Sequence, residues 1–133
     1  MAELSFQSVT VTFNPAGIPN PDIPILTFSN REIVVPAGIG MITFHLETVG
    51  VSQSEGARFQ TSPLQWLDPQ NPEVPILDPH MFVLQRIGDW DLTLVDYNSV
   101  LGSSVTHLFN IVVVYQGQTY GSDPTIINEP EDG

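Results

Sequence analysis

The chain of 133 residues contains no cysteine and no lysine. The absence of cysteine excludes a disulfide framework, a thiolate metal site and a cysteine nucleophile. A small domain without cysteine is typical of a reducing compartment, so we expect a cytoplasmic location. Without lysine, the positive charge of the chain rests on Arg31, Arg58 and Arg86.

Basic charge is therefore scarce. The 15 acidic residues face 3 arginines, and the formal net charge is -12. A polyanion would be repelled, so we expect no nucleic-acid partner and no attachment to an anionic membrane surface. Cationic partners or divalent cations would be attracted. The simplest interpretation of the acidic excess is that it keeps the protein in solution.

Long apolar runs and helical periodicity are also missing. No window approaches the ~20 apolar residues of a membrane span, and the start of the chain lacks the features of a signal peptide. Turn residues (12 prolines and 10 glycines) are spread along the chain instead. Short strands separated by turns every ~8–12 residues predict an all-β fold. We expect an immunoglobulin-like, antiparallel two-sheet β-sandwich of about 7–9 short strands, with residues 1–133 forming one domain.

Alternating apolar and polar residues locate the expected strands. We place strands at Phe6–Phe13, Arg31–Val35, Ile39–Thr48, Ala57–Gln60, His80–Arg86, Asp91–Tyr97, Thr106–Gln116 and Gln118–Tyr120, with shorter extended pieces at Ile25–Phe28 and Ile126–Ile127. Gln116 and Gly117 can form a two-residue hairpin turn. The segment Ser62–Pro79 carries five prolines, so we expect an extended, polyproline-like excursion there rather than a strand.

The strand at Thr106–Gln116 is apolar on both faces. Phe109, Ile111 and Val113 share one face, which we assign to the core. The reverse face is formed by Leu108, Asn110, Val112 and Val114. A strand apolar on both sides is either covered twice or presents one face to another chain. The reverse face is therefore our sequence-based candidate for an interface with a second copy or another protein.

The C-terminal segment combines two prolines with two side chains that favour turns. Asp123 before Pro124, and Asn128 before Glu129-Pro130, can accept hydrogen bonds from nearby amides in Asx-type turns. The isoleucine pair between them can anchor the segment to the core. We therefore predict that Asp123, Pro124, Asn128, Glu129 and Pro130 form a structural latch that fastens the chain end to the sandwich.

The same segment resembles a known family. The run Tyr120-Gly-Ser-Asp-Pro-Thr-Ile-Ile-Asn-Glu-Pro130 is similar to the signature of the bacterial DP-EP family, named for motifs that here are Asp123-Pro124 and Glu129-Pro130. Asp96-Tyr97-Asn98 and Phe109–Val114 are compatible with it, so the resemblance extends over most of the chain. It implies an immunoglobulin-like sandwich in an uncharacterised bacterial family and supplies neither an activity nor a catalytic residue.

Ligand-binding side chains occur without a recognisable motif. Asp89 and Asp91 share a face in an extended chain and are weak candidates for a calcium site, although calcium takes six to eight oxygens. With Asp96, they are most simply explained as solvated acids near a turn. Trp66 and Trp90 could stack on a sugar beside these acids, or pack against prolines as loop anchors.

Catalytic signatures are lacking too. His45, His80 and His107 lie on three different expected strands, with no metal-ligand spacing. No nucleophile elbow, phosphate-binding glycine loop or dinucleotide fingerprint occurs. We therefore expect a protein that is not an enzyme, with no catalytic residue and no cofactor. Its expected role is self-association or protein binding, and the alternative is a module that binds carbohydrate or calcium.

Overall fold

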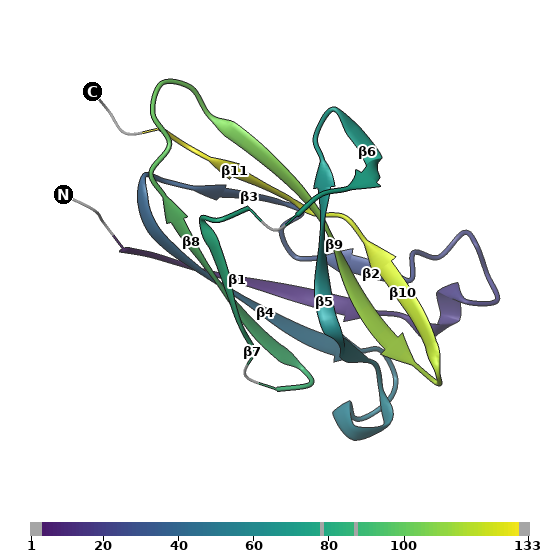
Figure 1. Cartoon of the computed structure of the whole chain (residues 1–133). Helices are drawn as coiled ribbons and strands as arrows, with labels where there is room; N and C mark the ends of the chain where they lie inside the picture. The colour runs from purple at the N-terminus through teal and green to yellow at the C-terminus, as the bar shows by residue number, and fades with distance from the viewer. Residues whose placement is uncertain (1–3, 78, 87, 131–133) are drawn as a thin grey trace.

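The computed structural model of the chain describes residues 4–77, 79–86 and 88–130. These residues form two β-sheets packed face to face as a sandwich (Figure 1). This confirms the expected all-β sandwich. The described part of the chain contains no α-helix; its helical elements are two 3-10 turns, Pro15–Gly17 and Gln53–Glu55.

Sheet A has five strands in the order β2-β1-β4-β8-β7. Sheet B has six, in the order β3-β11-β9-β5-β6, with β10 paired to β9. The strands of sheet A are β1 (Leu4–Phe13), β2 (Leu26–Phe28), β4 (Gly38–Thr48), β7 (Phe82–Arg86) and β8 (Asp91–Asn98). Those of sheet B are β3 (Glu32–Val35), β5 (Arg58–Asp68), β6 (Asn71–Pro75), β9 (Val105–Tyr115), β10 (Gln118–Ser122) and β11 (Thr125–Asn128).

The expectation of purely antiparallel sheets is wrong. β1 pairs with β4, and β3 with β11, in parallel. Parallel neighbours within one sheet normally need a long crossover, usually a helix. Here the chain visits the opposite sheet between them, since β3 of sheet B lies between β2 and β4 of sheet A in sequence. The loops that join the two sheets therefore replace the helical crossover.

The proline-rich segment is the second correction. It is not a polyproline-like excursion, because β5 and β6 cover most of it. Pro63 lies where the pairing of β5 with β9 shifts between Phe59 and Leu64, so the missing amide breaks no regular ladder. Pro72 and Pro75 lie in β6, at the edge of sheet B. With β6 and the two shorter pieces, which are strands β2 and β11, the described residues form eleven strands.

The two sheets enclose one apolar core. Its largest fully buried side chains include Phe13, Phe44, Phe59 and Phe109. The rings of Phe44 and Phe109, from opposite sheets, meet edge to face with their centroids 6.2 Å apart. The alternation in β1, β4 and β9 places Phe13, Phe44 and Phe109 inward.

The predicted hairpin turn between β9 and β10 is confirmed. Tyr115 pairs with Gln118, which leaves Gln116 and Gly117 as the two turn residues. Both have positive φ, 49° and 77°, as a type I′ turn requires. Gln116 is the one described non-glycine residue with positive φ.

Candidate functional site

The hydrophobic pattern of sheet A inverts along its strands. At one end, inward positions carry large apolar residues such as Val11, Phe44 and Leu92, all fully buried. At the other end, the same faces carry polar or minimal residues: Ser5 and Gln7 on β1, Gly38 and Gly40 on β4, and Asp96 and Asn98 on β8.

The outward positions at this second end are apolar instead. Strand pairing places Leu4 beside Ile39, with Tyr97 on the other side of Ile39, and Phe6 beside Met41, with Val95 on the other side of Met41. Leu4 and Phe6 are 62% and 70% exposed, which is unusual for side chains of this size. We call this surface the apolar patch; it comprises Leu4, Phe6, Ile39, Met41, Val83, Val95 and Tyr97.

Steric crowding explains why a glycine occupies position 40, on the inner side of the patch. A Cβ atom on Gly40 would lie 2.6 Å from Val35 Cγ1 and 3.4 Å from Ser5 Oγ. β3 therefore approaches β4 too closely for any side chain at position 40. At this end the two sheets come together over small and polar groups, so the core is thin and the large apolar residues point outward.

A buried polar cluster lies beneath the patch, formed by Asp96, Asn98 and Asn128. Asp96 and Asn128 are both 0% exposed. Asn128 Nδ2 donates to Asp96 Oδ1 (3.1 Å) and lies 3.0 Å from Met81 Sδ. Burial raises the pKa of Asp96 to about 7, and the hydrogen bond from Asn128 acts in the opposite direction. Asp96 is thus the described carboxyl group whose charge changes near neutral pH.

Asn98 joins three chain segments. Its Nδ2 donates to the carbonyl oxygens of Val35 (3.0 Å), Pro36 (3.1 Å) and Glu129 (2.9 Å). Its Oδ1 accepts from the amide of Val100, which makes the Asx-type turn after β8. One buried amide therefore ties the ends of β3, β8 and β11 together.

His107 faces the interior from β9. Its ring meets Phe82 and Trp66 edge to face, with centroids 5.0 and 6.3 Å away. Its Nε2 is buried without a hydrogen-bond partner. Burial lowers the pKa of His107, which favours the neutral ring.

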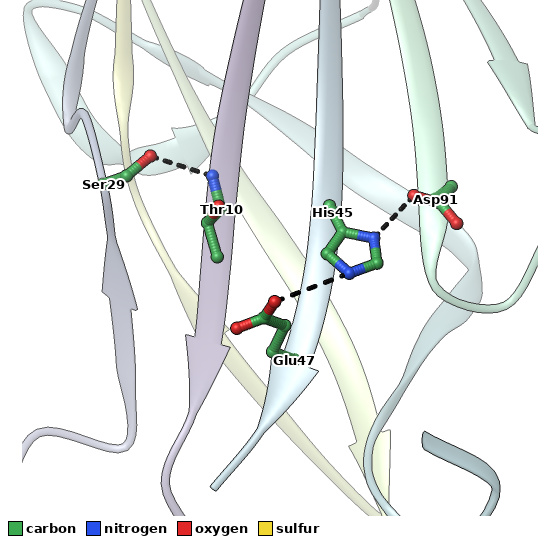
Figure 2. A network of polar contacts seen from close by, with 5 residues as sticks. All are labelled: Thr10, Ser29, His45, Glu47 and Asp91. Atoms are coloured by element: carbon green, nitrogen blue, oxygen red, sulfur yellow. Dashed lines mark hydrogen bonds and ion pairs between the residues drawn. The ribbon is translucent and has the colours of Figure 1, made fainter. Parts of the chain in front are cut away.

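The opposite end of the outer face of sheet A is polar (Figure 2). His45 lies between two carboxylates: Nδ1 is 2.7 Å from Asp91 Oδ1, and Nε2 is 3.7 Å from Glu47 Oε1. The three side chains are 39%, 42% and 59% exposed. An ion pair as exposed as this contributes little to stability. We call these three residues the polar row.

The two tryptophans do not form a sugar-binding platform. Trp66 is 3% exposed and stacks on Phe82, with ring centroids 4.4 Å apart, so it belongs to the core. Trp90 is half-buried in the turn before β8, and its Nε1 is buried without a partner. The prediction that Trp66 stacks on a ligand is wrong, because its pairing with Phe109 sets it among inward residues.

The acidic residues also fail to converge. Asp91 is engaged by His45, and the backbone oxygen of Asp89 accepts from the amide of Phe59. Within residues 4–77, 79–86 and 88–130, no three His, Asp or Glu side chains are grouped so that they could hold a metal ion. Asp96, interpreted from the sequence as a solvated acid, is fully buried.

The predicted interface on β9 lies on the outer face of sheet B. Leu108, Asn110, Val112 and Val114 are all half-buried there. Their neighbours are mixed: Val114 pairs with Arg58, Asn110 with Gln65, and Leu108 with Leu67. This face is less exposed and more polar than the apolar patch.

The predicted latch residues occupy β11 and its flanks. β11 is inserted between β3 and β9, with Ile126 fully buried and Pro124 also buried. The Asx-type turns expected at Asp123 and Asn128 are replaced by other contacts. Asp123 Oδ1 accepts from Arg31 Nη2 (3.3 Å), and Asn128 points into the core.

The end of the segment is held by its backbone. The amide of Glu129 donates to Val35 O (2.9 Å), while the Glu129 side chain is exposed and Pro130 is half-buried.

The surface of the described residues includes two hollows whose linings bear on function. One, of about 200 Å³, lies between β5 and β7 and is lined by Thr61, Ser62, Pro63, Leu64, Trp66, Phe82, Leu84 and Leu94. The other, of about 390 Å³, is lined by Gly17, Ile18, Pro21, Ile23, Pro24, Ile25, Leu26, Gly121 and Ser122. Neither is lined by an ionisable side chain, so neither offers acid–base chemistry.

No helix in the described parts of the chain is long and apolar enough to cross a membrane.

No family model and no curated protein matches the chain. Among solved structures, the chain is similar to the NMR structure of a protein from Bacteroides thetaiotaomicron, with a TM-score of 0.47 and 12% identity. The similarity covers 79% of this chain and 80% of the other. At this level it supports no statement about function.

Neither the apolar patch nor the burial of Asp96 was predicted from the sequence, although the alternation of residues along the strands indicated both. Asp96 stands two and four residues after Leu94 and Leu92, and therefore on the same face of the strand. Leu4 and Phe6 likewise alternate out of phase with Val9, Val11 and Phe13. A change of phase within one strand is the signal that would have located the patch.

Proposed function

We propose that this protein is a non-enzymatic protein-binding domain that pairs with a second copy of itself through the apolar patch. The observation that carries the proposal is the inverted pattern of sheet A. Leu4 and Phe6 are exposed on a strand whose following apolar residues are buried. Large apolar side chains that a monomer leaves in water are typical of association surfaces.

Charge favours a second copy over another kind of partner. A cationic partner would be attracted to a chain of net charge -12, but the seven patch residues include no carboxylate to receive it. A two-fold contact centred on the patch places uncharged surface on uncharged surface. The polar row lies at the other end of the same strands, so such a contact can keep the two acidic ends apart.

The resemblance to the DP-EP family and the expected cytoplasmic location belong to the same proposal and add no separate activity.

The test is a concentration series by sedimentation equilibrium with three variants. Phe6→Asp charges the patch, Leu101→Asp charges a loop residue that is 76% exposed, and Val112→Asp charges the outer face of sheet B. We expect a wild-type dimer that only Phe6→Asp dissociates. A wild-type monomer at all concentrations, or dissociation by Val112→Asp alone, would overturn the proposal.

A further inference from the structure

Asp96 and Asn128 form an incompletely bonded pair between the two sheets. Asp96 comes from β8 of sheet A and Asn128 from β11 of sheet B. Asn128 Nδ2 and Asp96 Oδ1 are joined at 3.1 Å. The remaining oxygens, Asp96 Oδ2 and Asn128 Oδ1, are both buried and have no partner.

Two hydrogen-bond acceptors cannot bond to each other, but a proton on Asp96 Oδ2 would allow a hydrogen bond between these two oxygens. A protonated carboxyl group has one donor and one acceptor, as does the edge of a primary amide. The two groups can therefore join through a second bond, from Asp96 Oδ2–H to Asn128 Oδ1. An ionised carboxylate would instead leave both oxygens unsatisfied in a region without solvent, at a high cost in desolvation.

Among the described residues, no ion pair supplies a charge that would favour ionisation of Asp96. His107 on β9 is the titratable group on the facing strand, and burial lowers its pKa and favours its neutral form. Glu32 on β3 is exposed, Glu129 after β11 is exposed, and His45 on β4 contacts Asp91 on the outer face. No ion pair formed by the described residues includes Asp96.

We propose that Asp96 is held as a neutral carboxylic acid that donates its proton to Asn128 Oδ1, and that this acid–amide pair is a proton-dependent lock on the C-terminal strand. β11 is the strand with which β3 pairs, so the lock also secures β3. Loss of the proton leaves an unpaired charge between the sheets and weakens the attachment of β11. The proposal stands independently of the dimer, because it concerns the interior of one chain.

Asp96→Asn tests the lock directly. An asparagine at this position can make both hydrogen bonds to Asn128 and cannot ionise. The pKa of Asp96 rises from 3.8 to about 7 on folding, so between these values only the unfolded chain loses the proton and wild type loses stability as pH rises. The unfolding equilibrium constant of wild type relative to Asp96→Asn should rise about tenfold per pH unit, about a thousandfold in all, and be constant above pH ~7.

Urea unfolding from pH 4 to pH 8.5 measures this ratio, with Asp22→Asn as the control for an exposed carboxylate. Hydrogen exchange adds a local readout at the Glu129 amide, which bonds Val35 O. The ratio of its exchange rate in wild type to that in Asp96→Asn should be larger at pH 8 than at pH 5. A pH-independent ratio, or a wild type that gains stability relative to the variant as pH rises, would overturn the lock.

If Asp96→Asn does not fold, isotope-edited infrared spectroscopy of wild type still decides. The carbonyl band of a protonated aspartate at pH 5.5, lost by pH 8.5, supports the lock. A spectrum with only carboxylate bands at pH 5.5 refutes it.

Discussion

On β4, Phe44 faces the interior and His45 faces outward, whereas four residues earlier Gly40 faces inward and Met41 outward. The first pair follows the usual rule for a sandwich strand, and the second reverses it. β8 repeats the reversal, with Leu92 buried at one end and Asp96 at the other. The comparison teaches that one sheet can reverse its pattern along its length: one end buries large apolar side chains in the core, and the other exposes them on the outer face.

The largest expected difference in stability is between removing a buried ring and removing an exposed ring from sheet A. Phe44→Ala removes a fully buried ring from the core and should lower the free energy of unfolding by about 3–5 kcal/mol. Phe6→Ala removes a ring that is 70% exposed and should change monomer stability by less than about 0.5 kcal/mol. Urea unfolding at a concentration below dimer formation measures both. Similar losses for the two variants would contradict the reversal.

The next largest loss of stability is expected from a second carboxyl group in the buried polar cluster. Asn128→Asp places a second carboxyl group beside Asp96, and at pH 8 should cost about 3 kcal/mol or more, since a buried charge would lack a partner. The loss should be smaller at pH 5, where protons neutralise the pair. Asn110→Asp, on the half-buried outer face of sheet B, is the matched control and should be nearly neutral. Equal costs at the two pH values would count against a buried pair.

His107→Phe should stabilise the protein. A phenyl ring keeps the edge contacts with Phe82 and Trp66 and removes the unpartnered Nε2, which should gain on the order of 1 kcal/mol. Because burial lowers the pKa of His107, the unfolded chain binds a proton that the folded chain resists, and wild type loses stability as pH falls below ~6.5. The advantage of the variant in thermal unfolding should therefore be larger at pH 5 than at pH 8.

The smallest effect is expected in the polar row. His45→Gln removes the exposed contacts with Asp91 and Glu47, and should cost less than about 1 kcal/mol. The cost should shrink in 1 M salt. His80→Gln, at another exposed histidine, is the control. His45→Gln should leave the proposed association unchanged. A variant that fails to associate would indicate an interface that extends over the whole outer face of sheet A.

The architecture was largely predictable from the sequence, because alternation is a local signal. The expected strands at Phe6–Phe13, Ile39–Thr48 and Thr106–Gln116 match β1, β4 and β9 within two residues at each end. The strand through Pro63 was not predictable, since it depends on a register shift against β9 that no local pattern encodes. The parallel pairings likewise depend on which sheet each loop reaches.

The site was less predictable for a related reason. Asp96 was interpreted as solvated because aspartate is rarely buried, and only its phase with Leu94 indicated otherwise. Whether Asn128 would turn back on its own backbone or reach Asp96 depends on a contact between residues 32 positions apart. Local chemistry cannot decide between two such partners.

The insertion of β11 between β3 and β9 has a consequence for the order of folding. β3 is made early, but the strand it pairs with is the last in the described chain, with Thr125 opposite Glu32. During synthesis, β3 must wait with its backbone groups exposed until residues 125–128 have left the ribosome. Contacts so distant in sequence slow folding and leave strand edges open to aggregation. Sheet B can therefore be completed only after β11 has emerged, and nascent chains halted before residue 125 should depend on chaperones.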